Sequence, residues 1–399
     1  MKALRFSRDI PRYAAARIAG TVVPGRGAAV GPLKLKDLDP PELPGPDWVR
    51  VRPRLAGICG SDLATVDGRA SGYFEPIVSF PFVPGHEVVG DLDDGARVVV
   101  EPVLGCATRG IVPPCAACAR GDLGGCERIT LGDLAPGLQS GYCCDTGGGW
   151  SVAMVAHPTQ LHPVADDLSD EAAVMIEPTA CAVHAALAAR IEPGAVVAVL
   201  GAGTLGLLTL AAVRHHADPA TVLVAARYPV QRELARELGA DVVVDPGEWR
   251  RGVRRATNSL AIGDGHIDRL TGGADVVIDC VGSEASLADS LAVVRPRGRV
   301  VLVGMPGTVN VDLTGLWHRE IELVGAYAYG TEHLPDRGPV RTFDLAAELV
   351  RHADLGRLVS ATYPLDRHRE AIEHAAAAGP RGAVKIAFDL RNEKERDRL

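Results

Sequence analysis

Residues 196–206 read VVAVLGAGTLG, and this stretch decides the fold of the second half of the chain. An apolar run of strand length ends at Leu200, and a helix-length segment, 204–216, opens directly after the glycines. Glycine permits a tight turn and a close approach of the backbone to a ligand, and the first N–H groups of a helix attract a pyrophosphate. The stretch therefore predicts a dinucleotide-binding loop; the alternative is a glycine-rich turn that only packs a helix on a sheet. The expected contact residues are Gly201, Gly203, Thr204, Leu205 and Gly206.

The segments after this loop continue the same alternation. Apolar runs lie at 221–226, 242–244, 276–279 and 300–303, and a helix-length segment lies at 230–238. Short apolar strands that alternate with helices are typical of a doubly wound parallel sheet with helices on both faces. We therefore expect an α/β fold with a Rossmann-type cofactor domain. The residues after the run at 276–279 are also assigned to the cofactor site, namely Cys280, Val281 and Gly282.

The end of the second apolar run indicates which dinucleotide binds. An NAD-binding domain usually places Asp or Glu about 20 residues after the glycines, where the acid binds the ribose 2′-hydroxyl. Residues 221–230 read TVLVAARYPV and contain no acid, but they supply Arg227, whose guanidinium could pair with a 2′-phosphate. This favours NADP over NAD. Alternatively, Arg227 is solvated or stacks on adenine, and either cofactor serves.

The first part of the chain has a different rhythm. In residues 1–160, short β-like runs at 48–52, 96–100 and 151–156 are separated by Gly- and Pro-rich turns, which indicates an antiparallel, barrel-like region. After Gly330, a helix at 342–352 and a last strand at 383–388 are expected to rejoin this region.

Three separated segments of the chain carry candidate metal ligands. They are GICGSD at 57–62, PGHEVVG at 84–90 and IEP at 176–178. A Cys, a His and a Glu from three loops can supply three ligands to a tetrahedral zinc and leave the fourth position for water or substrate. Each motif alone is weak, since a single Cys is usually part of the core and a His-Glu pair usually lies on the surface. Together, ahead of a dinucleotide loop, they point to a catalytic zinc.

In this order the motifs resemble the zinc-containing medium-chain dehydrogenase/reductase family, and the Glu-Pro pair resembles its sorbitol and glucose dehydrogenase-like branch. The resemblance covers almost the whole chain and includes 324–330, VGAYAYG. It implies a GroES-like β-barrel catalytic domain that begins with residues 1–180, a Rossmann domain over 181–325, and a return to the catalytic domain over 326–399. It also implies hydride transfer between an alcohol or polyol carbon and NADP or NAD.

The resemblance implies a role for each residue of the first cluster. Cys59 and His86 would bind zinc, with Glu177 as the third ligand, while Glu87 would lie beside the metal and exchange with water. By the same resemblance, Asp62 would accept a hydrogen bond from His86, and Ser61 would carry the proton released from the alcohol. Two competing ideas for the third position are Cys181, one helical turn beyond Glu177, and a site completed by water alone.

A second cysteine cluster resembles the structural zinc lobe of the family, expected at about 104–130. Cys115, Cys118 and Cys126 have the family spacing, but the position of the first cysteine is Val112. Cys106 lies nine residues before Cys115, and a longer loop could still bring it to the metal, since the extra closure entropy is below about 1 kcal/mol. Four thiolates would form a closed structural site. Cys143 or Cys144 is the reserve fourth ligand, and three cysteines left over from a lost site is the alternative.

Composition limits the partners and the location. The 399 residues carry a net charge of −8, which argues against nucleic acid as the main partner. No run has the roughly 18 apolar residues of a membrane span, and the charged start MKALRFSRDI does not look like a secretory signal, so we expect a cytoplasmic protein. In a reducing compartment the nine cysteines are thiols or metal ligands. By resemblance we expect a homodimer or homotetramer.

The expected substrate is a small alcohol, polyol or sugar. Trp150, in a glycine-rich turn, is either a substrate contact or a packing corner. Two other functions share the fold: a zinc-free quinone or enoyl reductase, and a non-catalytic NADP-binding protein. A zinc-free reductase lacks the metal ligand set, and a non-catalytic protein would be favoured by a missing ligand or a missing Ser61. This chain has all of these residues, so the sequence favours the zinc enzyme.

Overall fold

The computed structural model describes residues 1–263 and 269–393, and the chain divides into two compact units. The first unit comprises Met1–Glu177 and Tyr329–Leu399, and the second comprises Pro178–Ala328. The boundaries expected from the sequence lie after residues 180 and 325. Within the described part of the chain, no helix combines the length and the apolar character that crossing a membrane requires.

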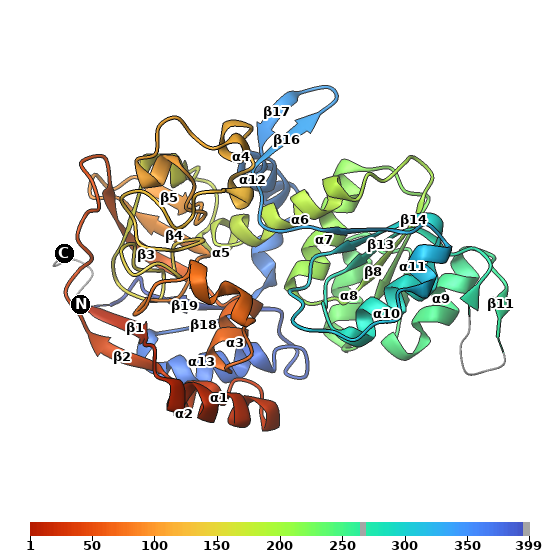
Figure 1. The fold of residues 1–399 in the computed structure, drawn as a ribbon, viewed down its shortest axis with the longest axis horizontal. Coiled ribbons are helices and arrows are strands. Elements are labelled where there is room, and N and C mark those ends of the chain that lie inside the picture. The colour runs from red at the N-terminus through yellow and green to blue at the C-terminus, as the bar shows by residue number, and fades with distance from the viewer. Residues whose placement is uncertain (264–268, 394–399) are drawn as a thin grey trace. The chain divides into compact units, whose positions relative to one another are not determined.

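The second unit is built on a six-stranded parallel sheet with strand order β10-β9-β8-β13-β14-β15 (Figure 1). In chain order this is 3-2-1-4-5-6, the arrangement of a doubly wound dinucleotide-binding fold. The strands are β8 (Val196–Leu200), β9 (Thr221–Ala225), β10 (Val242–Val244), β13 (Ala274–Asp279), β14 (Val294–Leu302) and β15 (Glu322–Gly325). The helices are α7 (Thr204–His216), α8 (Pro229–Glu237), α9 (Trp249–Ala256), α10 (Glu284–Val293) and α11 (Thr314–His318), and a small pair, β11 (Ala261–Ile262) and β12 (Arg269–Leu270), accompanies them.

Both faces of the central strands β8, β9 and β13 are buried, which explains their nearly unbroken apolar sequences. In β8, Ala198 and Leu200 belong to a cluster with Trp249 of α9 and Leu287 of α10, while the intervening Val199 is also fully buried. The α/β fold class is therefore confirmed, and α7 begins and ends at the residues expected from the sequence.

The first unit is built on a mostly antiparallel sheet with the path β18-β19-β3-β4-β5-β7, in which β6 also pairs with β3. Its strands are β3 (Val49–Gly57), β4 (Val88–Asp91), β5 (Arg97–Val100), β6 (Met154–Ala156), β7 (Leu161–Pro163), β18 (Val359–Tyr363) and β19 (Lys385–Asp389), beside the separate pairs β1 (Lys2–Phe6) with β2 (Leu33–Asp37) and β16 (Thr331–Leu334) with β17 (Gly338–Arg341). Its helices are α1 (Ile10–Val22), α2 (Gly27–Val30), α3 (Gly60–Val66), α4 (Ala116–Ala119), α5 (Asp170–Ala173), α12 (Thr342–His352) and α13 (His368–Ala376), and α6 (Ile176–Ala188) crosses the boundary to the second unit. As expected, the C-terminal segment returns to this unit, since β19 pairs with β3.

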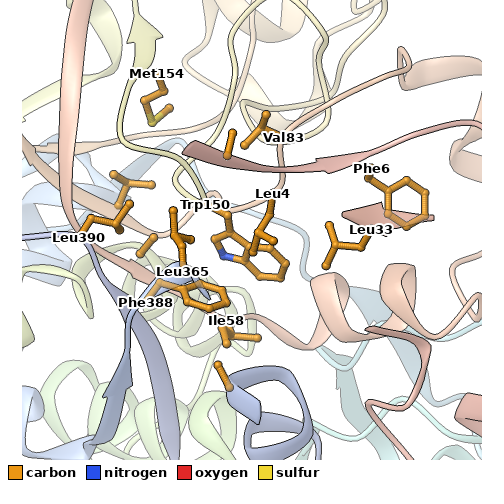
Figure 2. Packing of buried hydrophobic residues seen from close by; sticks show 14 of the residues in the cluster. Leu4, Phe6, Leu33, Ile58, Val83, Trp150, Met154, Leu365, Phe388 and Leu390 are labelled. Carbon is orange, nitrogen blue, oxygen red and sulfur yellow. The ribbon is translucent and has the colours of Figure 1, made fainter. Parts of the chain in front are cut away.

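The core of the first unit surrounds Trp150, which is fully buried. Figure 2 shows its indole ring among Leu4, Ile58 and Phe388, and the ring meets Phe388 edge-on at 5.1 Å between centroids. The indole N–H donates to the Gly57 carbonyl oxygen at 3.2 Å. Of the two roles considered for Trp150, the structure supports the packing corner.

Helices α1 and α2, which the sequence analysis did not anticipate, lie between β1 and β2 and pack beside α13 (Figure 1). The buried carboxylate of Asp67, just after α3, accepts hydrogen bonds from the N–H groups of Gly25 (2.9 Å) and Gly27 (3.0 Å). A side chain on Gly27 would place its Cβ 2.2 Å from the Val66 carbonyl oxygen. This segment is therefore anchored to the end of α3.

Candidate active site and metal centres

Cys59, His86 and Glu87 form one group in the first unit, with one potential ligand atom of each lying within 4.8 Å of the others. Cys59 stands immediately before α3, and the other two immediately before β4. Gly85 makes this placement possible: its φ is +96°, and a Cβ there would lie 2.4 Å from the Trp150 ring. The core around Trp150 therefore fixes the position of the histidine segment.

Glu177, expected as the third ligand, lies outside this group at the start of α6 and is buried. Its Oε1 accepts a hydrogen bond from the Tyr329 hydroxyl at 2.9 Å. Burial raises the pKa of Glu177 to about 7; His86 partly offsets this rise, and the Glu87 carboxylate adds to it. The carboxylate that the structure groups with Cys59 and His86 is thus that of Glu87, while Glu177 stands close enough to interact with both His86 and Glu87.

Lys385, at the start of β19, forms a buried ion pair with Glu87. Its ammonium also donates to the Ile58 carbonyl oxygen at 3.2 Å. Burial opposes the charge of Lys385, but the Glu87 carboxylate outweighs it, and the pKa of Lys385 is raised above its usual value. Sequence reasoning missed this residue; the available signal was a single lysine in the otherwise apolar run 383–388.

Asp62, in the first turn of α3, contacts both Cys59 and His86. Its Oδ2 accepts a hydrogen bond from the Cys59 N–H at 3.0 Å, and its Oδ1 lies 3.5 Å from Nδ1 of His86. The second distance suits an electrostatic contact and is long for a hydrogen bond. Although burial disfavours an imidazolium, the Asp62 carboxylate raises the pKa of His86 well above its usual value. The same field makes the imidazole a stronger metal ligand.

Two hydroxyl groups lie beside Asp62. Ser61 is half-buried in the first turn of α3. The Tyr142 hydroxyl, which sequence reasoning missed, donates to Oδ1 of Asp62 at 3.3 Å. Burial, together with Asp62, raises the pKa of Tyr142 well above 10, so the phenol stays protonated.

A thiol, an imidazole and a carboxylate are the donor set of zinc, and a buried group of three leaves room for a further ligand. With Nδ1 of His86 turned toward Asp62, Nε2 is the nitrogen available to a metal. The residues present therefore fit a catalytic zinc.

The second cysteine cluster is also assembled: Cys106, Cys115, Cys118 and Cys126 each offer a sulfur within 4.8 Å of the others. The sulfurs of Cys106 and Cys126 are 3.8 Å apart, which matches the edge of about 3.8 Å expected for a tetrahedron with Zn–S bonds of about 2.3 Å. Burial opposes the Cys115 thiolate, yet N–H groups donated by Cys118 and Glu127 lower the pKa of Cys115 to about 6. This thiolate is ready to bind a metal.

The insert that separates Cys106 from Cys115 is organised by Arg109. Its side chain is fully buried and donates to the carbonyl oxygens of Leu131, Leu134 and Gly137, the last at 2.6 Å. The N–H of Cys115 also donates to the sulfur of Cys106 at 3.3 Å. Thus the longer loop folds back and brings Cys106 to the other three cysteines.

The other cysteines considered as ligands belong to neither group among the described residues. Cys143 is buried, with its sulfur 3.6 Å from the Ala135 carbonyl oxygen, and Cys144 is exposed. Cys181 lies in α6, one turn after Glu177.

In the second unit, the glycine loop joins β8 to α7 as the sequence predicted. Gly201 has a φ of +99°, and a Cβ on Gly206 would lie 1.8 Å from the Gly201 carbonyl oxygen. Gly203 caps α7 and has open space in front of it, with Thr204 and Leu205 following in the first turn. The backbone thus presents the N terminus of α7 to solvent, where a pyrophosphate can bind.

The remaining cofactor residues stand at the same carboxyl edge of the sheet. Arg227 follows β9 and is exposed, and no carboxylate within residues 1–263 and 269–393 pairs with its guanidinium. Cys280, Val281 and Gly282 follow β13, where the N–H groups of Val281 and Gly282 donate to Oδ1 of Asp279. Ligands of doubly wound sheets bind at this edge.

Two family models match the chain. The model described as an alcohol dehydrogenase GroES-like domain matches residues 45–166, and the model described as a zinc-binding dehydrogenase matches residues 204–339. The first matched region contains Cys59, His86 and the four-cysteine lobe.

Curated relatives match nearly the full length of the chain. The L-idonate 5-dehydrogenase of Vitis vinifera is 29% identical over 90% of this chain and 92% of its own length. The sorbitol dehydrogenase of Bacillus subtilis (strain 168) is 28% identical over 86% of this chain and 90% of its own. A solved structure from Sinorhizobium meliloti 1021, described as a zinc-binding dehydrogenase bound to NADP, matches with a TM-score of 0.69 at 25% identity and covers 97% of this chain and 98% of that chain.

Proposed function

This chain belongs to the zinc-type medium-chain alcohol and polyol dehydrogenases, and from that membership we propose how its residues divide the work of the reaction. The enzyme transfers a hydride between an alcohol or polyol carbon and a nicotinamide cofactor, and it uses zinc. The zinc-free reductase and the non-catalytic protein are not supported, since the matched relatives are named as L-idonate and sorbitol dehydrogenases. The single observation that carries the assignment of roles is the grouping of Cys59, His86 and Glu87.

We propose that Cys59 and His86 hold the catalytic zinc and that Glu87 and Glu177 provide the carboxylates at the metal. When bound, zinc acts as a Lewis acid that lowers the pKa of the substrate hydroxyl. The pairing of Glu87 with Lys385 and the hydrogen bond from Tyr329 to Glu177 support a division of roles between the two acids. Lys385 holds the Glu87 carboxylate beside Cys59 and His86, and the Tyr329 hydroxyl orients the Glu177 carboxylate.

The chain's own hydroxyl and carboxylate groups handle the proton and the orientation of the ligands. Ser61 is proposed to accept the proton that leaves the substrate hydroxyl and to pass it outward. Asp62 holds the Cys59 backbone with one oxygen and faces the His86 ring with the other. The four-cysteine lobe, with Cys106 as its first ligand, is proposed to hold a second, structural zinc.

For the cofactor, we propose binding at the loop 201–206 and a preference for NADP over NAD. The support is the exposed guanidinium of Arg227 at the end of β9 and the absence of an acid in residues 221–230. Residues 1–180 and 326–399 would then form the catalytic domain, and residues 181–325 the cofactor domain.

For the substrate, we propose a polyol or sugar, on the basis of relatives named for sorbitol, L-idonate and D-xylulose. We also propose a homodimer or homotetramer: β15 is the edge strand of its sheet, and Leu323 on it and nearby Trp317 are exposed. A cytoplasmic location is proposed because all nine cysteines are thiols, and six of them either lie in the two candidate metal groups or are buried.

A panel of polyols and simple alcohols, assayed with NADP and with NAD at the nicotinamide absorbance, tests the function. The purified protein should contain about two zinc ions per chain. Changing Cys59→Ala should lower kcat by at least about 100-fold, since even residues that only support a metal ligand are worth 10–100-fold. Cofactor binding, followed by quenching of protein fluorescence, should persist in this variant. A chain without zinc, or full turnover by the variant, would remove the proposal.

A further inference from the structure

Tyr142 lies beside the proposed zinc ligands, in a segment far from them in the sequence. Its side chain is buried, and its ring centroid is 6.0 Å from that of His86 and 5.2 Å from that of Phe82. Its hydroxyl donates to Oδ1 of Asp62 at 3.3 Å and lies 3.3 Å from Oγ1 of Thr65. A phenylalanine would fill the same space without this polar group. Burying a hydroxyl costs free energy unless it is hydrogen-bonded. The hydroxyl of Tyr142 is therefore tolerated because of its contacts with Asp62 and Thr65.

The two oxygens of Asp62 are held differently. Oδ2 accepts the Cys59 N–H at 3.0 Å, whereas Oδ1 receives the Tyr142 hydroxyl and faces Nδ1 of His86 at 3.5 Å. In the described part of the chain, Nδ1 of His86 is buried and makes no hydrogen bond of standard geometry, so the Asp62 oxygen is the acceptor that it faces. The phenol is therefore the side-chain donor that fixes the rotation of the carboxylate that His86 faces.

We propose that Tyr142 is a positioning residue for the catalytic metal site. Its hydroxyl fixes the Asp62 carboxylate, and Asp62 in turn fixes the His86 ring and the backbone at Cys59. This inference rests on the proposed function, because it requires a zinc at Cys59 and His86. Tyr142 does not touch the metal. It acts through Asp62, as carboxylates that orient a metal-ligating histidine do in other zinc sites.

The test measures how fast zinc is released to an excess of a chromogenic chelator. The zinc-loaded full chain is used, both as wild type and as Tyr142→Phe. Release should occur in two phases, and the phase that is missing in Cys59→Ala belongs to the catalytic site. We expect this phase to be about tenfold faster in Tyr142→Phe, the lower end of the effect known for residues that support metal ligands. The phase of the four-cysteine lobe should not change and serves as an internal reference.

Two matched variants isolate the hydroxyl's contact with Asp62. Tyr363→Phe also removes a phenol hydroxyl, one that is half-buried and bonded to the His374 ring at 2.8 Å, and should release zinc at the wild-type rate. Thr65→Val removes another hydroxyl in contact with that of Tyr142 and should also stay within about twofold of the wild-type rate. Faster release in either variant would mean that any loss of a buried hydroxyl loosens the site, and would overturn the proposal.

A double-mutant cycle completes the test. Asp62→Asn should itself accelerate release, and adding Tyr142→Phe to it should change the rate by less than about twofold, because both changes break the same link. Independent, multiplying effects would overturn the role through Asp62. An unchanged rate in Tyr142→Phe, with a clear catalytic phase in the wild type, would overturn the inference alone. A wild-type chain with no zinc phase that depends on Cys59 would overturn the proposed function and the inference with it.

Discussion

Three acidic residues meet near the proposed catalytic zinc, and the donor that faces each one distinguishes them. Asp62 receives the Cys59 N–H, Glu87 pairs with Lys385, and Glu177 receives the Tyr329 hydroxyl. A buried carboxylate without such a donor would cost several kcal/mol, so each partner also determines where its acid can stand. At the scale of single residues, the groups that donate to these carboxylates therefore define the site as much as the expected zinc ligands do.

The cofactor preference depends on one exposed residue. Changing Arg227→Ala should raise the KM for NADP by about tenfold or more, since a charge-assisted pair with a 2′-phosphate is worth about 1.5–3 kcal/mol, and should leave the KM for NAD unchanged. Steady-state kinetics with each cofactor measure this. Arg236→Ala, an exposed arginine further along α8, is the matched control. An equal loss with both cofactors would show that Arg227 does not read the phosphate.

Stability near neutral pH should depend on His368, which is buried at the start of α13. Burial lowers the pKa of His368, and the neighbouring cations Arg369 and Lys34 lower it further, although the Leu365 carbonyl oxygen and Asp366 oppose them. The folded state therefore prefers the neutral ring. Its contribution is fully present above the unfolded pKa of about 6.5 and is lost as the pH falls through the lower folded value.

We accordingly expect the wild-type Tm to drop between about pH 7.5 and about pH 5.5, and to drop less in His368→Gln, which cannot take up a proton. Thermal unfolding followed by circular dichroism at both values measures the difference. Identical drops in the two proteins would contradict the assignment.

At the scale of elements, the four-cysteine lobe depends on its insert. Arg109 ties the segment after Cys106 to the carbonyl groups around 131–137, so a loop longer than the family pattern still closes on the other three cysteines. Changing Cys106→Ser should remove about one zinc per chain and lower the Tm by several degrees, because a structural zinc stabilises the fold that binds it. Metal analysis and thermal unfolding measure both effects. Cys144→Ser, at an exposed cysteine outside the group, should change neither, and a full zinc complement in Cys106→Ser would exclude Cys106 as a ligand.

At the scale of the whole molecule, the two units have separate cores, one around Trp150 and one around Trp249. Metal and dinucleotide should therefore stabilise different parts of the chain. Removing zinc with a chelator should increase hydrogen exchange in residues 104–130 and around Cys59 and His86, and leave β8 and β9 protected. Adding NADP should increase protection at 201–206 in both the zinc-loaded and the zinc-free protein. Exchange that rises uniformly over both units after zinc removal would contradict this independence.

The sequence by itself determined the parts that depend on neighbouring residues. The strand–glycine–helix pattern at 196–216 gave the doubly wound fold and the bounds of α7, because hydrophobic period and glycine geometry are local properties. It also pointed to Cys59 and His86 as a pair. Only the tertiary structure brought Cys106 to its cluster, grouped Glu87 with Cys59 and His86, and buried Trp150 in the core. The roles of Lys385 and Tyr142 could not be predicted from the sequence, because their partners are distant in the chain. Their partners lie 298 and 80 residues away, and only packing decides which buried charge or hydroxyl meets which partner over such separations.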